Sequence, residues 1–149
     1  MFIYLDNCSL NRPFDDQSQI RIKLETIAKL HIQSMIFARE LDLVWSYILD
    51  YENNANPFEE RKVAIQQWRD RAKQIISGNP EIVSKAKFIQ TEYRLGSADA
   101  LHVACALSAK ASYFITTDER IQKRAPIINK LRILNPVEFI LIDKEERDA

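Results

Sequence analysis

The sequence predicts an α/β fold, a three-layer α/β/α sandwich around a central parallel sheet of four to five strands. Short apolar segments alternate along the chain with longer amphipathic segments, which is typical of a parallel sheet covered by helices on both faces. The 149 residues are 46% hydrophobic and include only 2 glycines and 5 prolines, so they fit one core and leave no room for a flexible linker. We therefore expect a single domain over residues 1–142 and a charged tail over residues 143–149 that frays.

The strands are expected where short apolar runs interrupt the amphipathic stretches. The first such run begins at the N-terminus and is rich in β-branched or aromatic residues, as buried strands are. Four runs meet the description: Phe2–Leu5, Leu41–Trp45, Ser112–Thr116 and Leu131–Leu134.

Between the strands, apolar residues recur at steps of three to five, which predicts helices. Ser46 is expected to cap the helix that carries Glu52. Residues 7–17 are polar, contain a proline and are expected to form a loop with at most a short helical turn. The other helices are expected over Ser18–Glu40, Pro57–Ser77, Pro80–Tyr93, Ser97–Lys110, Asp118–Ala125 and Pro136–Ile142.

Charge and cysteine content exclude several classes of protein. Lys and Arg number 21 and equal the 21 Asp and Glu, so the chain as a whole is not a basic nucleic-acid binder, although a local basic rim around an acidic site is compatible with this balance. Cys8 and Cys105 make neither a disulfide framework nor a zinc spacing and are expected to be small buried hydrophobes. Asp6 interrupts the first apolar run too early for a signal peptide or a membrane span. We expect a reduced cytoplasmic protein with no membrane association.

Four acidic residues stand where an apolar element ends or where its buried face continues. Asp6 and Asp118 follow the first and third predicted strands, and sites in open α/β sheets lie beyond the carboxyl ends of the strands. Asp99 opens a helix that is almost uncharged after it. Glu52 lies on the apolar stripe of its helix, whereas Asp50 shares a face with polar residues and is expected to be solvated.

Each of these carboxylates also has a purely structural interpretation. Asp6 fits a turn, Asp118 fits a helix N-cap, Asp99 is favoured by the helix dipole, and Glu52 could simply end a helix. Desolvating an unpaired carboxylate costs several kcal/mol, however, so four converging carboxylates with few neighbouring cations predict a shared divalent metal. Oxygen ligands select Mg²⁺ or Mn²⁺ rather than zinc.

Further residues are expected to support this site. His102 lies one turn after Asp99 and is either a proton shuttle or second donor at the site, or a histidine satisfied in the core. Five cations neighbour the site segments and are candidates to contact phosphate. The expected supporting residues are Asn7, Ser9, Thr117 and His102, and the cations are Arg12 and Arg120, with Arg94, Lys123 and Arg124.

Several segments resemble the PIN-domain superfamily, and the similarity covers essentially the whole chain. The most specific are Ser97–Ala104, with its Ala-Asp-Ala-Leu-His-Val-Ala motif, and Phe114–Asp118, with Thr-Thr-Asp. Tyr4–Asn7 and Glu52 complete the pattern. Two further stretches, Asn11–Asp16 and Asn135–Phe139, resemble a bacterial branch of the superfamily.

The resemblance implies an α/β/α nuclease that binds Mg²⁺ or Mn²⁺ through its acidic cluster and cleaves RNA. It gives metal-site roles to Asp6, Glu52, Asp99 and Asp118. Many relatives are VapC-type toxins of type II toxin–antitoxin pairs, which form dimers and are inhibited by a small antitoxin. One departure is Asn7, because relatives often have Thr or Ser after the first aspartate; Ser9 is the candidate to compensate.

The function expected from these observations is that of a metal-dependent ribonuclease, the toxin of a toxin–antitoxin pair. One alternative is a non-catalytic PIN-like module that binds RNA or protein, which a degraded acidic set would indicate; here all four acids are present. A second is a phosphoacceptor signalling domain. It would need an acidic pair after the first strand and a lysine after a late one, but Asn7 follows Asp6 and no lysine adjoins Thr117.

Overall fold

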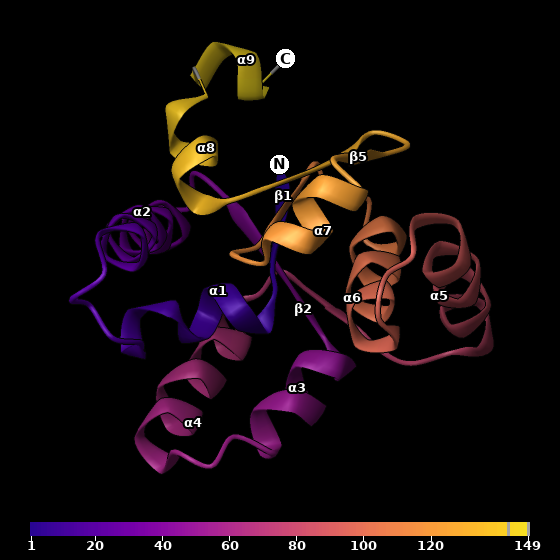
Figure 1. Ribbon diagram of the computed structural model, residues 1–149, viewed down its shortest axis with the longest axis horizontal. Coiled ribbons are helices and arrows are strands. Elements are labelled where there is room, and N and C mark those ends of the chain that lie inside the picture. Colours follow the sequence, from indigo (N-terminus) through magenta and orange to yellow (C-terminus); the bar gives the residue numbers. More distant parts are fainter. Residues whose placement is uncertain (143, 149) are drawn as a thin grey trace.

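The computed structural model describes residues 1–142 and 144–148. It contains a six-stranded sheet of order β3-β2-β1-β4-β6-β5, flanked by helices (Figure 1). Helices α5 and α6 pack together on one side, and α2 and α8 on the other. This confirms the predicted α/β/α class with a mostly parallel sheet.

The described elements have the following bounds. The strands are β1 (Phe2–Leu5), β2 (Asp42–Ser46), β3 (Gln74–Ile76), β4 (Tyr113–Ile115), β5 (Ile127–Ile128) and β6 (Leu131–Leu134). The α-helices are α1 (Asn7–Asn11), α2 (Ile20–Phe37), α3 (Tyr47–Asn54), α4 (Glu59–Gln66), α5 (Pro80–Tyr93), α6 (Ser97–Ser108), α7 (Glu119–Arg124), α8 (Pro136–Leu141) and α9 (Lys144–Asp148). Two 3₁₀ turns, η1 (Arg12–Phe14) and η2 (Gln67–Arg71), follow α1 and α4.

The centre of the sheet is a set of parallel strands buried on both faces. Tyr4 of β1 pairs in register with Val44 of β2 and Phe114 of β4, and all three side chains are fully buried. Burial on both faces explains why these strands are continuous apolar runs rather than alternating ones. Because β1, β2 and β4 run parallel, the residues that follow them all meet at one edge of the sheet.

The prediction of one helix over Pro57–Ser77 is wrong. Helix α4 ends at Gln66, and the later residues form η2 and then strand β3, which pairs with β2 at Ile75 and Trp45. Sheet pairing at this edge overrides the helical spacing of the apolar residues. Strand β3 and the antiparallel β5 bring the sheet to six strands rather than four to five.

The predicted loop over residues 7–17 contains the helix α1 and the turn η1. Asp6 is the N-cap of α1, since its Oδ1 accepts a hydrogen bond from the Ser9 backbone N–H at 3.0 Å. A side chain that satisfies an otherwise orphaned donor is enough to start this short helix directly after β1.

The inward face of α2 differs from the one that its apolar spacing predicts. Ile20, Leu24 and Ile27 are 77%, 52% and 54% exposed, whereas Glu25 and Lys29 are buried. Glu25 pairs with two arginines, and the Lys29 ammonium lies 5.4 Å from the centre of the Trp68 ring. Burial lowers the pKa of Lys29 to about 7. The first half of α2 therefore presents an apolar face to the outside.

The C-terminal tail, predicted to fray, forms the short helix α9 over Lys144–Asp148, and Glu146 pairs with Arg132 at 3.8 Å. Asp143 and Ala149 lie outside the described residues. In the described part of the chain, no helix combines the length and apolar character needed to cross a membrane.

Candidate active site

Asp6 is a buried carboxylate whose oxygens both accept hydrogen bonds at the carboxyl edge of the sheet. It is 3% exposed. Its Oδ1 caps α1, and its Oδ2 accepts from the Thr116 hydroxyl at 2.6 Å. Burial nevertheless raises its pKa to about 6; the bonds from Thr116 and Ser9 lower the pKa, and the charge of Asp99 raises it further. The site thus holds a carboxylate that the surrounding protein does not fully stabilise as an anion.

Asp118 is connected to Asp6 through Thr116. The Thr116 hydroxyl that donates to Asp6 also accepts from the Asp118 backbone N–H at 3.0 Å. The carboxylate of Asp118 caps α7 by accepting from the Arg120 backbone N–H at 2.9 Å. Asp118 is therefore the N-cap of α7, the structural role considered above, and is also linked to Asp6 through Thr116. Thr117 is buried, with a hydroxyl that has no hydrogen-bond partner in the described residues.

Asp99 lies in the first turn of α6, half-buried and close to the other acids. Its pKa is raised above the usual value, first by burial and then by the negative charges of Asp118 and Glu52; the positive potentials of His102 and Arg120 oppose this. Asp99 is therefore a partly desolvated carboxylate within electrostatic range of two other acids.

Glu52 is the terminus of a buried chain of hydrogen bonds. Its Oε1 bonds to His102 Nε2. His102 Nδ1 lies 2.6 Å from the Tyr4 hydroxyl, which lies 2.6 Å from Ser46 Oγ. Ser46 Oγ accepts from the Leu49 N–H. His102 therefore acts in both capacities considered for it, as a buried core histidine and as a donor to a site carboxylate.

A carboxylate can only accept, so His102 Nε2 donates to Glu52 Oε1. The Tyr4 hydroxyl joins the other ring nitrogen of His102 to the Ser46 hydroxyl. Asp50, predicted to be solvated, instead accepts from Trp45 Nε1 at 2.9 Å and pairs with Arg69 at 3.6 Å.

Replacing Tyr4 by Phe is expected to lower the free energy of unfolding by roughly 1–3 kcal/mol, because buried groups of His102 and Ser46 each lose a partner. Thermal denaturation at neutral pH measures this. Tyr113→Phe is the matched control, because the Tyr113 hydroxyl makes no hydrogen bond in the described part of the chain. Equal melting temperatures for the two variants would contradict the hydrogen-bond chain.

The thiol of Cys8, whose position beside the acids sequence reasoning missed, lies within electrostatic range of all four carboxylates. The Cys8 side chain is exposed rather than buried as predicted, whereas Cys105 is buried. Enough protein surrounds the Cys8 thiol that desolvation raises its pKa to about 12, and the charges of Asp6, Asp118, Asp99 and Glu52 add to the rise. Four segments far apart in sequence therefore contribute negative potential at this thiol.

The donor chemistry of this cluster fits a hard divalent cation. All four ligand candidates are carboxylates, and burial, with a further contribution from neighbouring carboxylates, raises the pKa of Asp6 and of Asp99, a cost that a bound cation would compensate. Among residues 1–142 and 144–148, however, no group of three or more His, Cys, Asp or Glu side chains is arranged closely enough to hold a metal. The four candidate carboxylates therefore lie in one region of the described structure but are not arranged as a preformed set of metal ligands.

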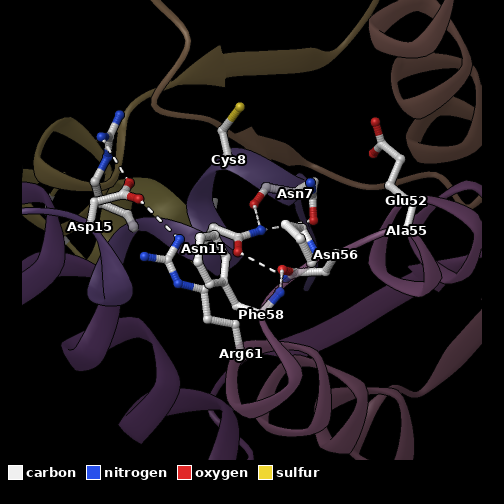
Figure 2. A pocket seen from close by; sticks show the side chains of 11 residues that line it. Asn7, Cys8, Asn11, Asp15, Glu52, Ala55, Asn56, Phe58 and Arg61 are labelled. Carbon is white, nitrogen blue, oxygen red and sulfur yellow. Dashed lines mark hydrogen bonds and ion pairs between the residues drawn. The ribbon is translucent and has the colours of Figure 1, made fainter.

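Neither Asn7 nor Ser9 supplies a side-chain hydroxyl to the Asp6 carboxylate. Asn7 Oδ1 accepts from Asn11 Nδ2 at 3.0 Å, so its amide is tied to the next turn of α1 (Figure 2). Ser9 holds Asp6 with its backbone N–H and donates its hydroxyl to the Ile115 carbonyl at 2.9 Å. Ser9 therefore orients Asp6 and fixes α1 to β4. The hydroxyl that contacts the Asp6 carboxylate comes from Thr116.

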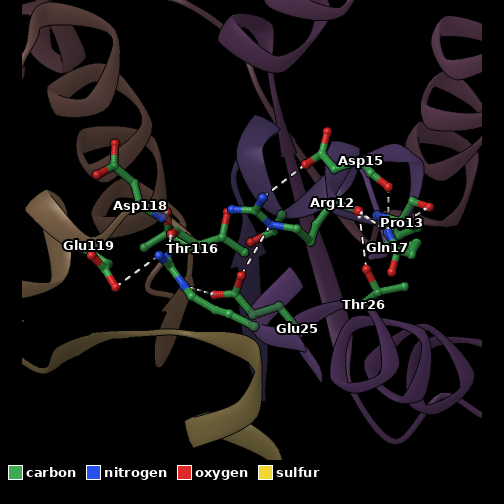
Figure 3. A network of polar contacts seen from close by, with 12 residues as sticks. Arg12, Pro13, Asp15, Gln17, Glu25, Thr26, Thr116, Asp118 and Glu119 are labelled. Atoms are coloured by element: carbon green, nitrogen blue, oxygen red, sulfur yellow. Dashed lines mark hydrogen bonds and ion pairs between the residues drawn. The ribbon is translucent and has the colours of Figure 1, made fainter. Parts of the chain in front are cut away.

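The candidate phosphate-binding cations differ in how exposed they are and in whether they already pair with carboxylates of the protein. Arg12 pairs with Asp15 at 3.1 Å and with the buried Glu25 at 3.3 Å, in a network that Figure 3 shows. Arg120 is 78% exposed and lies 3.9 Å from Asp118, so it extends from the acidic cluster into solvent. Arg124 donates to the Arg94 carbonyl.

Comparison with known proteins gives the same family that the motifs indicate. No curated protein matches the sequence significantly. Among solved structures, VapBC2 from Rickettsia felis bound to a promoter DNA fragment aligns with a TM-score of 0.58 at 16% identity over 91% of this chain and 98% of that chain. PAE2754 from Pyrobaculum aerophilum aligns at 0.57 and 17% identity over 95% and 87%. VapBC-1 from nontypeable Haemophilus influenzae aligns at 0.55 and 20% over 91% and 98%. At these identities the structures share the fold with this chain.

The PIN domain profile matches residues 3–127, and the chain therefore belongs to the PIN-domain family.

Proposed function

We propose that this protein is a Mg²⁺- or Mn²⁺-dependent endoribonuclease that acts as the toxin of a type II toxin–antitoxin pair. The observation that carries the proposal is the convergence of Asp6, Glu52, Asp99 and Asp118, whose charges all act on the Cys8 thiol. PIN domains are generally nucleases, which supports a hydrolase at the level of the family. The intact acidic set favours catalysis over the alternative of a non-catalytic binding module.

The proposed chemistry divides among the residues as follows. Asp6 and Asp99 would hold the principal ion, and Glu52 and Asp118 would orient its water or hold a second ion. A bound ion supplies a nucleophilic water near neutral pH and shields charge on the phosphate. Hydrogen bonds from Thr116 and Ser9 keep the Asp6 carboxylate in place. A hydrogen bond from His102 does the same for Glu52. Exposed Arg120 is placed to contact the RNA phosphate.

Purified protein is expected to cleave unstructured RNA when Mn²⁺ or Mg²⁺ is added and to stop when EDTA is added. Gel analysis of end-labelled RNA measures this, and internal fragments would identify an endonuclease. Binding of RNA without cleavage under any metal would favour the non-catalytic module instead.

The antitoxin part of the proposal is supported by the exposed apolar face of α2. Ile20, Leu24 and Ile27 occupy successive turns and are more than half exposed, and such a face is suited to burial by a partner. Two of the structural neighbours are VapBC complexes by name. A homodimer and a cytoplasmic location belong to the same proposal.

Co-expression with the small reading frame immediately upstream, where one exists, is expected to give a co-purifying complex without cleavage activity. Leu24→Glu should weaken that complex, because burying an unpaired carboxylate costs several kcal/mol. Val83→Glu on α5 is the matched control, since Val83 is also exposed. Equal recovery of the complex with both variants would remove α2 as the partner surface.

A further inference from the structure

A cavity of about 480 Å³ opens beside the acidic cluster. Glu52 and Cys8 line the side near the carboxylates, and Phe58 and Arg61, at the start of α4, line another (Figure 2). We propose that this cavity takes one unstacked base of single-stranded RNA, from the nucleotide next to the phosphate that is cut. This inference rests on the proposed ribonuclease function and names how its substrate is recognised.

A row of three asparagine amides forms part of the cavity lining. The Phe58 N–H donates to Asn56 Oδ1 at 3.1 Å, so the Asn56 amide nitrogen donates to Asn11 Oδ1 at 3.3 Å. Asn11 Nδ2 then donates to the Asn7 backbone carbonyl at 2.9 Å and to Asn7 Oδ1 at 3.0 Å. Backbone groups at both ends thus fix the orientation of all three amides. Asn7 Nδ2 is left as a donor with no partner among the described residues.

The aromatic side of the cavity is a ring held in place by an arginine. Phe58 is 56% exposed, and the guanidinium of Arg61 lies 4.5 Å from its ring centre. Arg61 is fixed in turn, because it donates to the Phe14 carbonyl at 2.6 Å and pairs with Asp15 at 3.6 Å. An exposed ring on a fixed support is the kind of platform on which proteins stack single-stranded bases.

The cations that line the cavity are paired within the protein, because Arg12 and Arg61 both pair with Asp15 and Arg12 also pairs with Glu25. Glu52 is hydrogen-bonded to His102. What remains available is an amide donor and an aromatic face, which suits a neutral heteroaromatic base better than a phosphate. In the proposed orientation the 4-position of a pyrimidine faces the Asn7 amide donor, which meets an acceptor at O4 of uracil but a donor amine in cytosine. That orientation of the base would favour uracil over cytosine.

The stacking part is tested by the binding of fluorescein-labelled hexauridylate and hexacytidylate to the full chain in EDTA, read by anisotropy. Phe58→Leu is expected to weaken binding of hexauridylate about 10-fold, and Phe58→Tyr, which keeps the ring, should restore it. Phe88→Leu on α5 changes another exposed phenylalanine, which lies outside the cavity, and should bind as wild type does. Equal affinities for Phe58→Leu and Phe88→Leu would overturn the proposal.

The amide row is tested by base preference. Wild type is expected to prefer hexauridylate by about 5-fold, and Asn11→Ala should abolish that preference because the Asn7 amide is then free to turn. A preference for hexacytidylate in wild type, or one that Asn11→Ala leaves unchanged, would contradict the role of the row.

Cleavage of the same RNAs with Mn²⁺, measured in parallel, separates the two proposals. Cleavage without any effect of Phe58→Leu on binding or rate would leave the nuclease standing and remove the base pocket. Binding that depends on Phe58 without cleavage would support the pocket and remove the nuclease.

Discussion

Asp99→Asn is expected to lower kcat/KM for metal-dependent RNA cleavage by at least about 10²–10³-fold, the scale on which single charge-stabilising groups act at active sites. Burial raises the pKa of Asp99, and the negative charges of Asp118 and Glu52 raise it further. Asparagine keeps the shape of the side chain but removes the charge that would hold the ion. Initial rates on a quenched fluorescent RNA with saturating Mn²⁺ measure the loss.

Asp70→Asn is the matched control for this variant. It makes the same chemical change at an exposed aspartate of η2, away from the acidic cluster, and should retain wild-type activity. The circular dichroism spectrum of Asp99→Asn should match that of wild type. An active, folded Asp99→Asn protein would remove this carboxylate from the proposed metal site, and an unfolded one would make Asp99 a structural residue.

The second large effect is on stability: Asp6→Asn should stabilise the metal-free protein by up to about 3 kcal/mol at neutral pH. The folded protein binds the Asp6 proton with a pKa of about 6, above the usual 3.8. The folded state therefore holds more protons between these values, and wild-type stability falls as pH rises from about 4 to about 6. Above pH 6 the whole cost of the buried charge is present, and asparagine removes it.

Urea denaturation of both proteins at several pH values, with EDTA, measures this effect. The difference between them should shrink toward zero near pH 4, where wild-type Asp6 is protonated and neutral, which provides an internal control. Asparagine is also a good N-cap, so α1 should be retained. A lower stability for Asp6→Asn at neutral pH would mean that the Thr116 and Ser9 bonds outweigh the desolvation of the charge.

The approach of the four candidate acids could be anticipated from sequence because their positions follow structural rules. Asp6 and Asp118 stand directly after β1 and β4, and parallel pairing of these strands brings their carboxyl ends to one edge. Glu52 and Asp99 stand on the inward faces of helices at the same edge. The hydrogen bonds of Thr116 to Asp6 and of Tyr4 to His102 span 110 and 98 residues, and no local pattern encodes such pairings.

The errors in the predicted fold have a common cause. Strand β3 forms because β2 offers it an edge to pair with, although its own spacing is helical. In the first half of α2, Glu25 is buried through its pairing with Arg12 and Arg21, whereas Ile20, Leu24 and Ile27 are exposed. In both segments, long-range partners outweigh local periodicity.

The most direct test of the central claim is the melting temperature of wild type and Asp99→Asn with and without Mn²⁺. For ~10 mM ion and a Kd of ~1 mM, linkage gives about 1.4 kcal/mol of stabilisation, a Tm rise of roughly 3–6 °C at this chain length. Wild type is expected to show that rise and Asp99→Asn to show none. Equal responses of the two proteins would contradict a metal site built on Asp99 and would favour a non-catalytic binding domain.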